Sequence, residues 1–295
     1  MLSFSSQQRE QLCQAIVTAG DRALKSAKQS FAVFEKGTDD YVTEVDRQLD
    51  AQLSAAIGGA FPTDGVISEE NPSSFSAFQT DPDSLWLIDP IDGTEDYIHH
   101  RPYYSVMVGL LQDYCPVSGW IYAPAFQQLY WGGAGWGLWQ CDCDRRDRSF
   151  AEAAYSLHPR SPQLGPTETG GSIIIGDRDQ QRFGSAIAAQ LPQLKVYSLG
   201  SFGLKVLEVI RGRAGLYIYL NGRVKLWDTA GPVALALGAG LVCCDLLGQP
   251  LKFTPDFVES QTLVHHQTIV IGWSDYIDAL LPTLRSAILS VGLRQ

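Results

Sequence analysis

The sequence has few cysteines and no long hydrophobic run. Its 295 residues include 6 cysteines, none in a C-x-x-C pair, so the chain resembles neither a disulfide-rich secreted domain nor a zinc-binding one. No apolar stretch approaches the roughly 20 residues that a membrane-spanning helix needs. The first residues also lack the basic and then apolar segments of a signal peptide. We therefore predict a cytoplasmic protein that neither spans nor binds a membrane.

Basic residues are also in short supply. The chain has 22 lysines and arginines against 32 aspartates and glutamates, a formal charge of −10. This balance argues against a nucleic acid polymer or an anionic membrane as a partner. An enzyme of this charge that acts on a small phosphorylated molecule would need local cations or bound metal ions, because carboxylates repel phosphate.

The order of apolar and polar segments indicates an α/β (α+β) fold with two lobes. Apolar residues at helical spacing predict helices over 5–28 and from Thr43, the second ended by Gly58 and Gly59. A buried strand over 85–88 and an antiparallel meander over 104–140 follow. Alternating strands and helices after about residue 150 favour an N-terminal lobe over 1–150 and a C-terminal lobe over 151–295.

The segment Asp89-Pro90-Ile91-Asp92-Gly93-Thr94 carries the main chemical signal. Two carboxylates, separated by two residues, follow the buried strand, and the turn can direct both of them and the Ile91 carbonyl toward one point. Mg²⁺ prefers such hard oxygen ligands. If Thr94 opens a helix, the amides of Gly93 and Thr94 point at a bound phosphate. The alternative is an ordinary Asp-Gly turn whose aspartates only cap the backbone.

Three more acidic residues are candidates for the same site. Glu69 follows the apolar pair Val66-Ile67, which places a carboxylate at the end of another strand. Asp46 lies in a helix start, and Asp228 lies at a predicted helix N-terminus. Taken alone, Glu69 is better explained as one of a pair of solvated glutamates, and the two aspartates as helix caps.

Three separated motifs resemble the inositol monophosphatase superfamily of metal-dependent phosphatases. The motifs are Ser68-Glu69-Glu70, then Trp86-Leu87-Ile88-Asp89-Pro90-Ile91-Asp92-Gly93-Thr94, then Trp227-Asp228-Thr229-Ala230-Gly231. The resemblance implies a layered sandwich of helices and sheets. It also implies that two or three Mg²⁺ ions bind to Glu69, Asp89, Asp92, Asp228 and the Ile91 carbonyl. Asp46 and Thr94 would orient the attacking water, with Glu69 contributing to catalysis as well as to metal binding.

The C-terminal half is similar to the bacterial 3'(2'),5'-bisphosphate nucleotidase branch of that superfamily. The likeness lies in segments such as Gly200-Ser201-Phe202-Gly203-Leu204-Lys205. It implies hydrolysis of the 3'-phosphate of 3'-phosphoadenosine 5'-phosphate, with Gly93, Thr94, Lys205 and Asp228 at the substrate. A second phosphate would need a second cationic anchor, and the cations nearest in sequence to the Asp228 motif are Lys205, Arg223 and Lys225. These three are equally well explained as solvated surface charges. The branch pattern is incomplete, since Phe202-Gly203 interrupts what is usually a Ser-Ser-Leu-Lys run, and Tyr219 follows Ile218 where an arginine is usual after the Leu-Tyr strand.

Two other functions remain open at this stage. An inositol monophosphatase or another small sugar-phosphate phosphatase is the first alternative, favoured by His99-His100-Arg101-Pro102. A metal-binding or nucleotide-binding regulator without turnover is the second, and the presence of all the expected acidic residues argues against it. The resemblance allows either a monomer or a homodimer.

Overall fold

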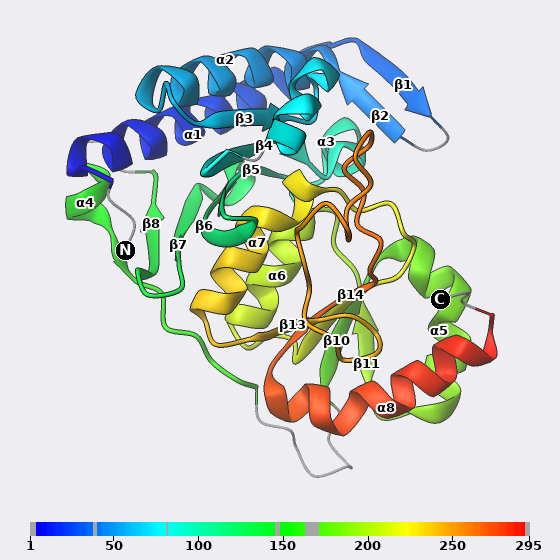
Figure 1. The fold of residues 1–295 in the computed structure, drawn as a ribbon. Helices are drawn as coiled ribbons and strands as arrows, with labels where there is room; N and C mark the ends of the chain where they lie inside the picture. The colour runs from blue at the N-terminus through cyan, green and yellow to red at the C-terminus, as the bar shows by residue number, and fades with distance from the viewer. Residues whose placement is uncertain (1–3, 38–39, 81, 145–147, 163–170, 293–295) are drawn as a thin grey trace.

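The computed structural model describes residues 4–37, 40–80, 82–144, 148–162 and 171–292 of the chain (Figure 1). Its α-helices are α1 (Ser6–Ser26), α2 (Glu44–Ala60), α3 (Thr94–Ile98), α4 (Phe150–Ala153), α5 (Asp177–Gln190), α6 (Phe202–Ile210), α7 (Leu226–Gly238) and α8 (Ser274–Ser290). Two short 3₁₀ segments are η1 (Pro72–Thr80) and η2 (Pro124–Phe126).

The strands form two large sheets and one hairpin. The 7-stranded sheet has the order β3-β4-β5-β6-β7-β8-β9, with β3 (Gly65–Ser68), β4 (Ser84–Asp92), β5 (Ser105–Gln112), β6 (Cys115–Ala123), β7 (Gln128–Gly133), β8 (Gly137–Asp142) and β9 (Tyr155–Ser156). The 5-stranded sheet has the order β11-β10-β12-β14-β13, with β10 (Ser172–Ile175), β11 (Lys195–Tyr197), β12 (Leu216–Tyr219), β13 (Val242–Cys244) and β14 (Ile269–Gly272). The hairpin is β1 (Val33–Gly37) with β2 (Asp40–Thr43).

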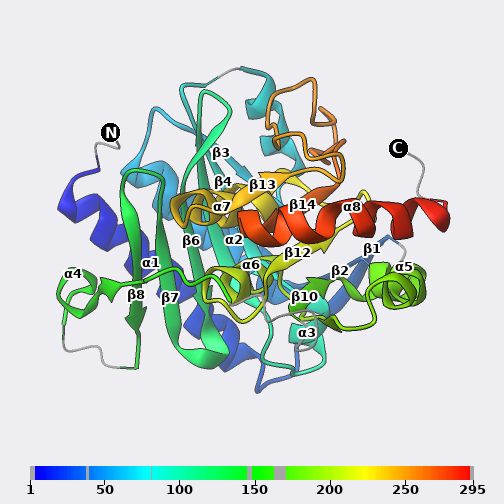
Figure 2. The same cartoon turned by 90° about the horizontal axis from the view of Figure 1, so that it is seen from below.

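Helices and sheets alternate in layers (Figures 1 and 2). Helices α1 and α2 pack together on one face of the 7-stranded sheet, and α6 and α7 lie between the two sheets. Helices α5 and α8 cover the outer face of the 5-stranded sheet. Each sheet thus buries both faces, which explains the near-continuous apolar runs of β4 and β10.

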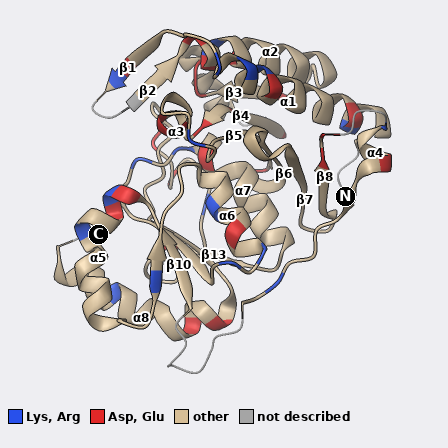
Figure 3. Cartoon of the chain, turned by 180° about the vertical axis from the view of Figure 1, so that it is seen from behind, with Lys and Arg blue, Asp and Glu red and all other residues tan. Residues whose placement is uncertain are grey.

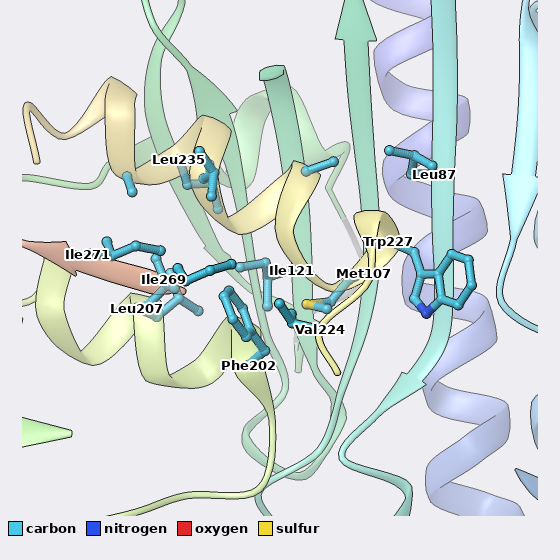
Figure 4. Close-up of a cluster of buried hydrophobic side chains, with 14 of the residues drawn as sticks. Leu87, Met107, Ile121, Phe202, Leu207, Val224, Trp227, Leu235, Ile269 and Ile271 are labelled. Atoms are coloured by element: carbon cyan, nitrogen blue, oxygen red, sulfur yellow. The ribbon is translucent and has the colours of Figure 1, made fainter. Parts of the chain in front are cut away.

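The central layer holds the two sheets together through one apolar cluster. Figure 4 shows Met107 and Ile121 of the 7-stranded sheet, Ile269 and Ile271 of the 5-stranded sheet, and Phe202 of α6 in this cluster. All of these side chains are buried. Side chains from both halves of the sequence therefore share one core, and the domain boundary near residue 150 stays a prediction.

Most of the predicted elements are confirmed. The helix expected over 5–28 is α1, the strand expected over 85–88 lies within β4, and the meander over 104–140 is β5 to β8 with antiparallel pairing. The alternation of strands and helices after residue 150 is also present. Within the described ranges, no helix combines the length and apolar composition needed to cross a bilayer.

One predicted boundary is wrong. Gly58 and Gly59 do not end α2, which continues to Ala60 and stops at Phe61. Neither glycine has a positive φ, and a Cβ added at either would contact nothing within 4 Å. Glycine lowers helix propensity but does not end a helix when the apolar stripe continues, and Ile57 of that stripe is buried against the sheet. The hairpin β1–β2, η1 and β13 were not anticipated.

Glycines allow α7 to lie directly on the 7-stranded sheet. A Cβ on Gly119 of β6 would stand 2.1 Å from the Gly231 carbonyl oxygen of α7, and one on Gly109 of β5 would stand 2.4 Å from the Gly231 amide nitrogen. These are backbone atoms, so no side chain could move aside to relieve the overlap. The start of α7, where Asp228 lies, is therefore held at a fixed distance from β5 and β6.

We predict that Gly119→Ala lowers the free energy of unfolding by about 2 kcal/mol or more, because the added methyl group overlaps the α7 backbone. Gly58→Ala is the matched control: it adds the same methyl group where nothing lies within 4 Å, and it should stabilise α2 by up to about 1 kcal/mol. Urea unfolding followed by circular dichroism measures both. Similar stability of the two variants would contradict this account of the packing.

Candidate metal centre and adjoining cavity

A bulge at the end of β4 turns two aspartates to the same side. Asp89 pairs with Met107 of β5, and Asp92 pairs with Ser105, so three steps along β4 match two steps along β5. Side chains alternate between the two faces of a regular strand, so residues three positions apart point to opposite faces. Without the bulge, Asp89 and Asp92 would therefore point away from each other. The extra residue in β4 corrects this, as β-bulges do.

A third carboxylate reaches the same place from α7. One oxygen each of Asp89, Asp92 and Asp228 lies within 4.8 Å of the other two. Asp228 Oδ2 also accepts a hydrogen bond of 2.7 Å from the Lys225 amide. The capping role considered from the sequence is thus present, and it fixes the side chain while its charge still contributes to the cluster.

These three acids fit a divalent cation that prefers oxygen ligands. Asp89 is buried, and its Oδ1 has no hydrogen-bond partner among the described residues. Burial and the charges of Glu69, Asp92 and Asp228 raise the pKa of Asp89 well above its usual range. Burial and the charges of Glu69 and Asp92 likewise raise the pKa of Asp228 to about 8. A bound cation would accept the free oxygen of Asp89 and offset this repulsion.

Helix α6 holds Asp92 through its N-terminus. The Phe202 amide donates to Asp92 Oδ1 at 3.0 Å and the Gly203 amide donates to Oδ2 at 2.9 Å, while the Ser201 hydroxyl also donates to Oδ2. These donors and Lys205 lower the pKa of Asp92, but burial outweighs them and the net shift is upward. Free amides at a helix N-terminus stabilise a negative charge, so α6 fixes one acid of the cluster from the second half of the chain.

Asp46 and Thr94 lie beside the cluster. Thr43 caps α2, and Asp46 at the third helical position accepts hydrogen bonds from the Thr43 amide at 2.8 Å and from the Thr43 hydroxyl. Thr94 Oγ1 donates to the Ile91 carbonyl at 2.9 Å and lies 3.5 Å from Asp46 Oδ1. The single hydroxyl proton of Thr94 thus goes to Ile91, which leaves Asp46 Oδ1 able to accept a proton or hydrogen bond from another molecule.

Glu69 borders this site from the end of β3. Its carboxylate pairs with Lys36 of the β1–β2 hairpin at 3.2 Å, and Glu70 pairs with the same ammonium at 2.6 Å. Burial lowers the pKa of Lys36, but the two carboxylates outweigh it and raise that pKa. Glu69 lies outside the group of three aspartates that come within 4.8 Å of one another. Its role as a metal ligand stays a prediction.

A cavity of about 510 Å³ opens beside Glu69 and Asp228. Cations and aromatic rings dominate its other walls. It is lined by Gly37, Glu69, Arg178, Tyr219, Gly222, Arg223, Lys225, Trp227, Asp228, Thr262 and Val264. A negatively charged ligand could therefore contact the cations while it reaches the acidic cluster.

Of the four residues predicted to contact substrate, Asp228 lines this cavity, and Gly93, Thr94 and Lys205 are not among its lining residues. Lys205 is buried beneath Asp92, where its Nζ donates to the Gly200 carbonyl at 3.0 Å and lies 5.6 Å from the centre of the Tyr217 ring. Gly93, with φ +89°, precedes α3, and a Cβ there would stand 2.9 Å from the Tyr103 carbonyl oxygen. Contact of Gly93, Thr94 or Lys205 with substrate stays a prediction.

The matching family model covers residues 5–287 and is described as the inositol monophosphatase family. The chain belongs to the inositol monophosphatase family. It is thus a metal-dependent phosphoric monoester hydrolase of the layered α/β type, as the resemblance of its motifs implied.

Individual relatives of this chain are named for more than one phosphatase activity. The chain is 28% identical to the 3'(2'),5'-bisphosphate nucleotidase CysQ of Salmonella typhimurium over 248 residues, which cover 83% of this chain and 94% of the relative. It is 37% identical to the fructose-1,6-bisphosphatase/inositol-1-monophosphatase of Aquifex aeolicus over 238 residues, 78% of this chain and 81% of the relative. The solved structure of Thermotoga maritima IMPase matches with a TM-score of 0.72 and 19% identity over 95% and 97% of the two chains.

Sequence reasoning missed residues that only the fold brings to the site. Arg178 lines the cavity, although it lies about 50 residues before Asp228 in the sequence. Ser201, whose hydroxyl contacts Asp92, belongs to a segment that the sequence linked only to substrate. No local pattern marks Arg178 or the contact of Ser201 with Asp92, because neither residue has a characteristic spacing from the acidic motifs.

The raised carboxylate pKa values predict how pH affects the metal-free protein. Between about pH 4 and pH 8 the folded state holds more protons on groups such as Asp228 than the unfolded state does. Its stability should therefore fall as pH rises through this window. In EDTA, calorimetry should give a higher melting temperature at pH 6 than at pH 8, and a smaller difference for Asp228→Asn. An equal difference in both proteins would exclude Asp228 as a source of the effect.

Proposed function

We propose that this protein is a Mg²⁺-dependent phosphomonoesterase whose metal ions bind at Asp89, Asp92 and Asp228. The observation that carries the proposal is the convergence of three carboxylate oxygens beside a cavity with cationic walls, together with the buried Asp89 Oδ1, which has no hydrogen-bond partner in the described part of the chain. Glu69 and the Ile91 carbonyl would complete the ligand set. All of these donors are hard oxygens, the kind that Mg²⁺ prefers.

The protein groups suited to position the attacking water are Asp46 and Thr94. Burial raises the pKa of Asp46 to about 6, so this carboxylate is mainly ionised at neutral pH and can still accept a proton. If the Thr94 hydroxyl turned from Ile91 toward Asp46, its oxygen could accept a hydrogen bond from the water. When bound, Mg²⁺ would lower the pKa of a water molecule that it coordinates and would neutralise charge on the phosphate.

We propose 3'-phosphoadenosine 5'-phosphate as the substrate, hydrolysed at its 3'-phosphate to give AMP and phosphate. Arg178, Arg223 and Lys225 place three cations on the cavity that holds Asp228, and this charge suits a second phosphate that does not react. Tyr219 and Trp227 add aromatic surface for a base. The likeness to CysQ supports this choice.

An inositol monophosphatase is the second candidate. The higher identity to the Aquifex aeolicus relative, whose name includes inositol-1-monophosphatase activity, favours it. Both candidates share the same proposed metal site, and they differ in whether the cations of the cavity hold a second phosphate.

We predict that Asp89→Asn reduces turnover at least about a hundredfold, because the amide weakens metal binding at the centre of the cluster. The metal-free variant should melt at the same or a higher temperature than the wild type, since the substitution removes one of the mutually repelling buried charges. Asp278→Asn, on an exposed position of α8, is the matched control and should change neither property. Phosphate release and calorimetric Mg²⁺ titration measure these effects, and full turnover by Asp89→Asn would refute the assignment.

Substrate choice is tested with a panel of 3'-phosphoadenosine 5'-phosphate, inositol 1-phosphate and fructose 1,6-bisphosphate, with and without Mg²⁺ and Li⁺. We expect kcat/KM for the nucleotide to exceed that for inositol 1-phosphate by at least about tenfold, because only the nucleotide can use the cations of the cavity. Equal or greater turnover of inositol 1-phosphate would favour the second candidate.

A substitution of Arg178 tests whether the cavity binds the second, non-reacting phosphate of the nucleotide. Arg178→Gln should raise KM for the nucleotide about tenfold and leave KM for inositol 1-phosphate nearly unchanged, since charge-assisted contacts to the second phosphate are lost. Arg285→Gln, an exposed α8 residue that lines none of the described cavities, is the control for loss of one positive charge. An equal effect of Arg178→Gln on both substrates would contradict the assignment of Arg178 to a second phosphate.

A further inference from the structure

A second cavity, of about 450 Å³, lies at the opposite end of α6 from the metal centre. Its walls include Tyr155, Leu157, His158, Arg160, Arg211 and Arg213. It shares no lining residue with the cavity beside Asp228. Figure 3 shows positively charged segments near the C-terminal end of α6 and on the adjacent coil.

The backbone builds this cavity from two distant segments. The Arg160 amide donates to the Ile210 carbonyl at 3.0 Å, and the Leu157 amide donates to the Leu138 carbonyl at 2.9 Å. Gly212 has φ +73°, and a Cβ there would stand 2.5 Å from the Arg160 carbonyl oxygen. The segment that carries Arg160 is therefore held against the end of α6, and its position relative to Arg211 is fixed by close backbone contact.

Nearby carboxylates neutralise the charge of Arg160, Arg211 and Arg213 only in part. Arg213 forms an ion pair of 2.7 Å with Glu208. Arg211 Nη1 donates to the neutral Tyr130 hydroxyl at 2.9 Å. Among the described residues, neither Arg160 nor Arg211 has a carboxylate within salt-bridge distance. None of the described residues that line the cavity is acidic, in a chain with 10 more acidic than basic residues.

Helix capping explains only part of this cluster. Arg211 is the residue that ends α6, where a cation interacts favourably with the helix dipole. That effect cannot account for Arg160, which comes from the coil after β9. Asp142 lies near the cavity, but its Oδ2 accepts a hydrogen bond of 3.3 Å from the Tyr155 hydroxyl and it forms no ion pair with the arginines. Three like charges with a single paired counter-charge, Glu208, raise the local potential for an anion.

We propose that Arg160, Arg211 and Arg213 form a binding site for a phosphate or sulfate group, separate from the catalytic centre. Guanidinium groups match such tetrahedral oxyanions through paired N–H donors. The ligand is either the free oxyanion or an ester of it. An ester has room to extend, because an adjoining cavity of about 680 Å³ shares Arg211 and Arg213 and has Tyr130, Tyr197 and Leu204 among its walls.

The test is titration of the full-length, Mg²⁺-loaded protein with inorganic sulfate at low ionic strength, followed by NMR of the arginine side-chain Nε–Hε signals. Sulfate should shift the signals of Arg160, Arg211 and Arg213. Arg160→Gln should weaken the binding measured at Arg213 about tenfold, and Arg285→Gln should not weaken it. Phosphate release from 3'-phosphoadenosine 5'-phosphate should be unchanged in Arg160→Gln, so failure of this site can be distinguished from failure of the proposed function.

Glu208→Gln should strengthen sulfate binding, whereas Arg160→Gln should weaken it. Removing the partner of Arg213 frees its guanidinium, so sulfate should bind severalfold more tightly. Tighter binding of 4-nitrophenyl sulfate than of sulfate would assign the site to an ester, and equal binding would assign it to the free oxyanion. The proposal is overturned if sulfate leaves the three signals unshifted, if Arg160→Gln and Arg285→Gln weaken binding equally, or if Glu208→Gln does not tighten it.

Discussion

Asp89, Asp92 and Asp228 bring three carboxylate oxygens within 4.8 Å of one another in a largely buried region. Burial disfavours the charged form of all three and raises each pKa, and repulsion by neighbouring carboxylates adds to the rise for Asp89 and Asp228. The surrounding structure balances this charge only in part, through the amides of α6 and the Lys225 amide. A divalent cation is the natural complement of this arrangement, and the family's dependence on metal ions follows from the same electrostatics.

The layered fold is what brings these acids together. Asp89 and Asp92 come from the 7-stranded sheet, whereas Asp228 comes from α7 and the donors to Asp92 come from α6. Both helices lie between the two sheets (Figure 1) and point their N-termini at the site. The glycine contacts between α7 and β5–β6 therefore affect chemistry as well as stability, because they determine how closely Asp228 approaches β4.

Charge is distributed along α6 in a way that the net value of −10 does not suggest. Its N-terminus contacts Asp92 in the acidic cluster, and its C-terminus carries Arg211 toward a cavity with cationic walls. A different set of cations lines the cavity beside Asp228. The excess of acidic residues predicted that local cations or metals would have to receive a phosphate group, but net charge could not reveal that cations gather at two separate places.

The sequence by itself determined the family, the main elements and the acidic motifs, because buried strands, capping residues and the segment from Asp89 to Thr94 are local patterns. It could not determine the β4 bulge, which depends on pairing with β5. Nor could it show that Lys205 lies beneath Asp92 while Arg178 lines the cavity. Those outcomes depend on how α5 and α6 pack between and against the sheets. Only the tertiary structure decided which cations face a ligand, because side chains distant in sequence meet only through that packing.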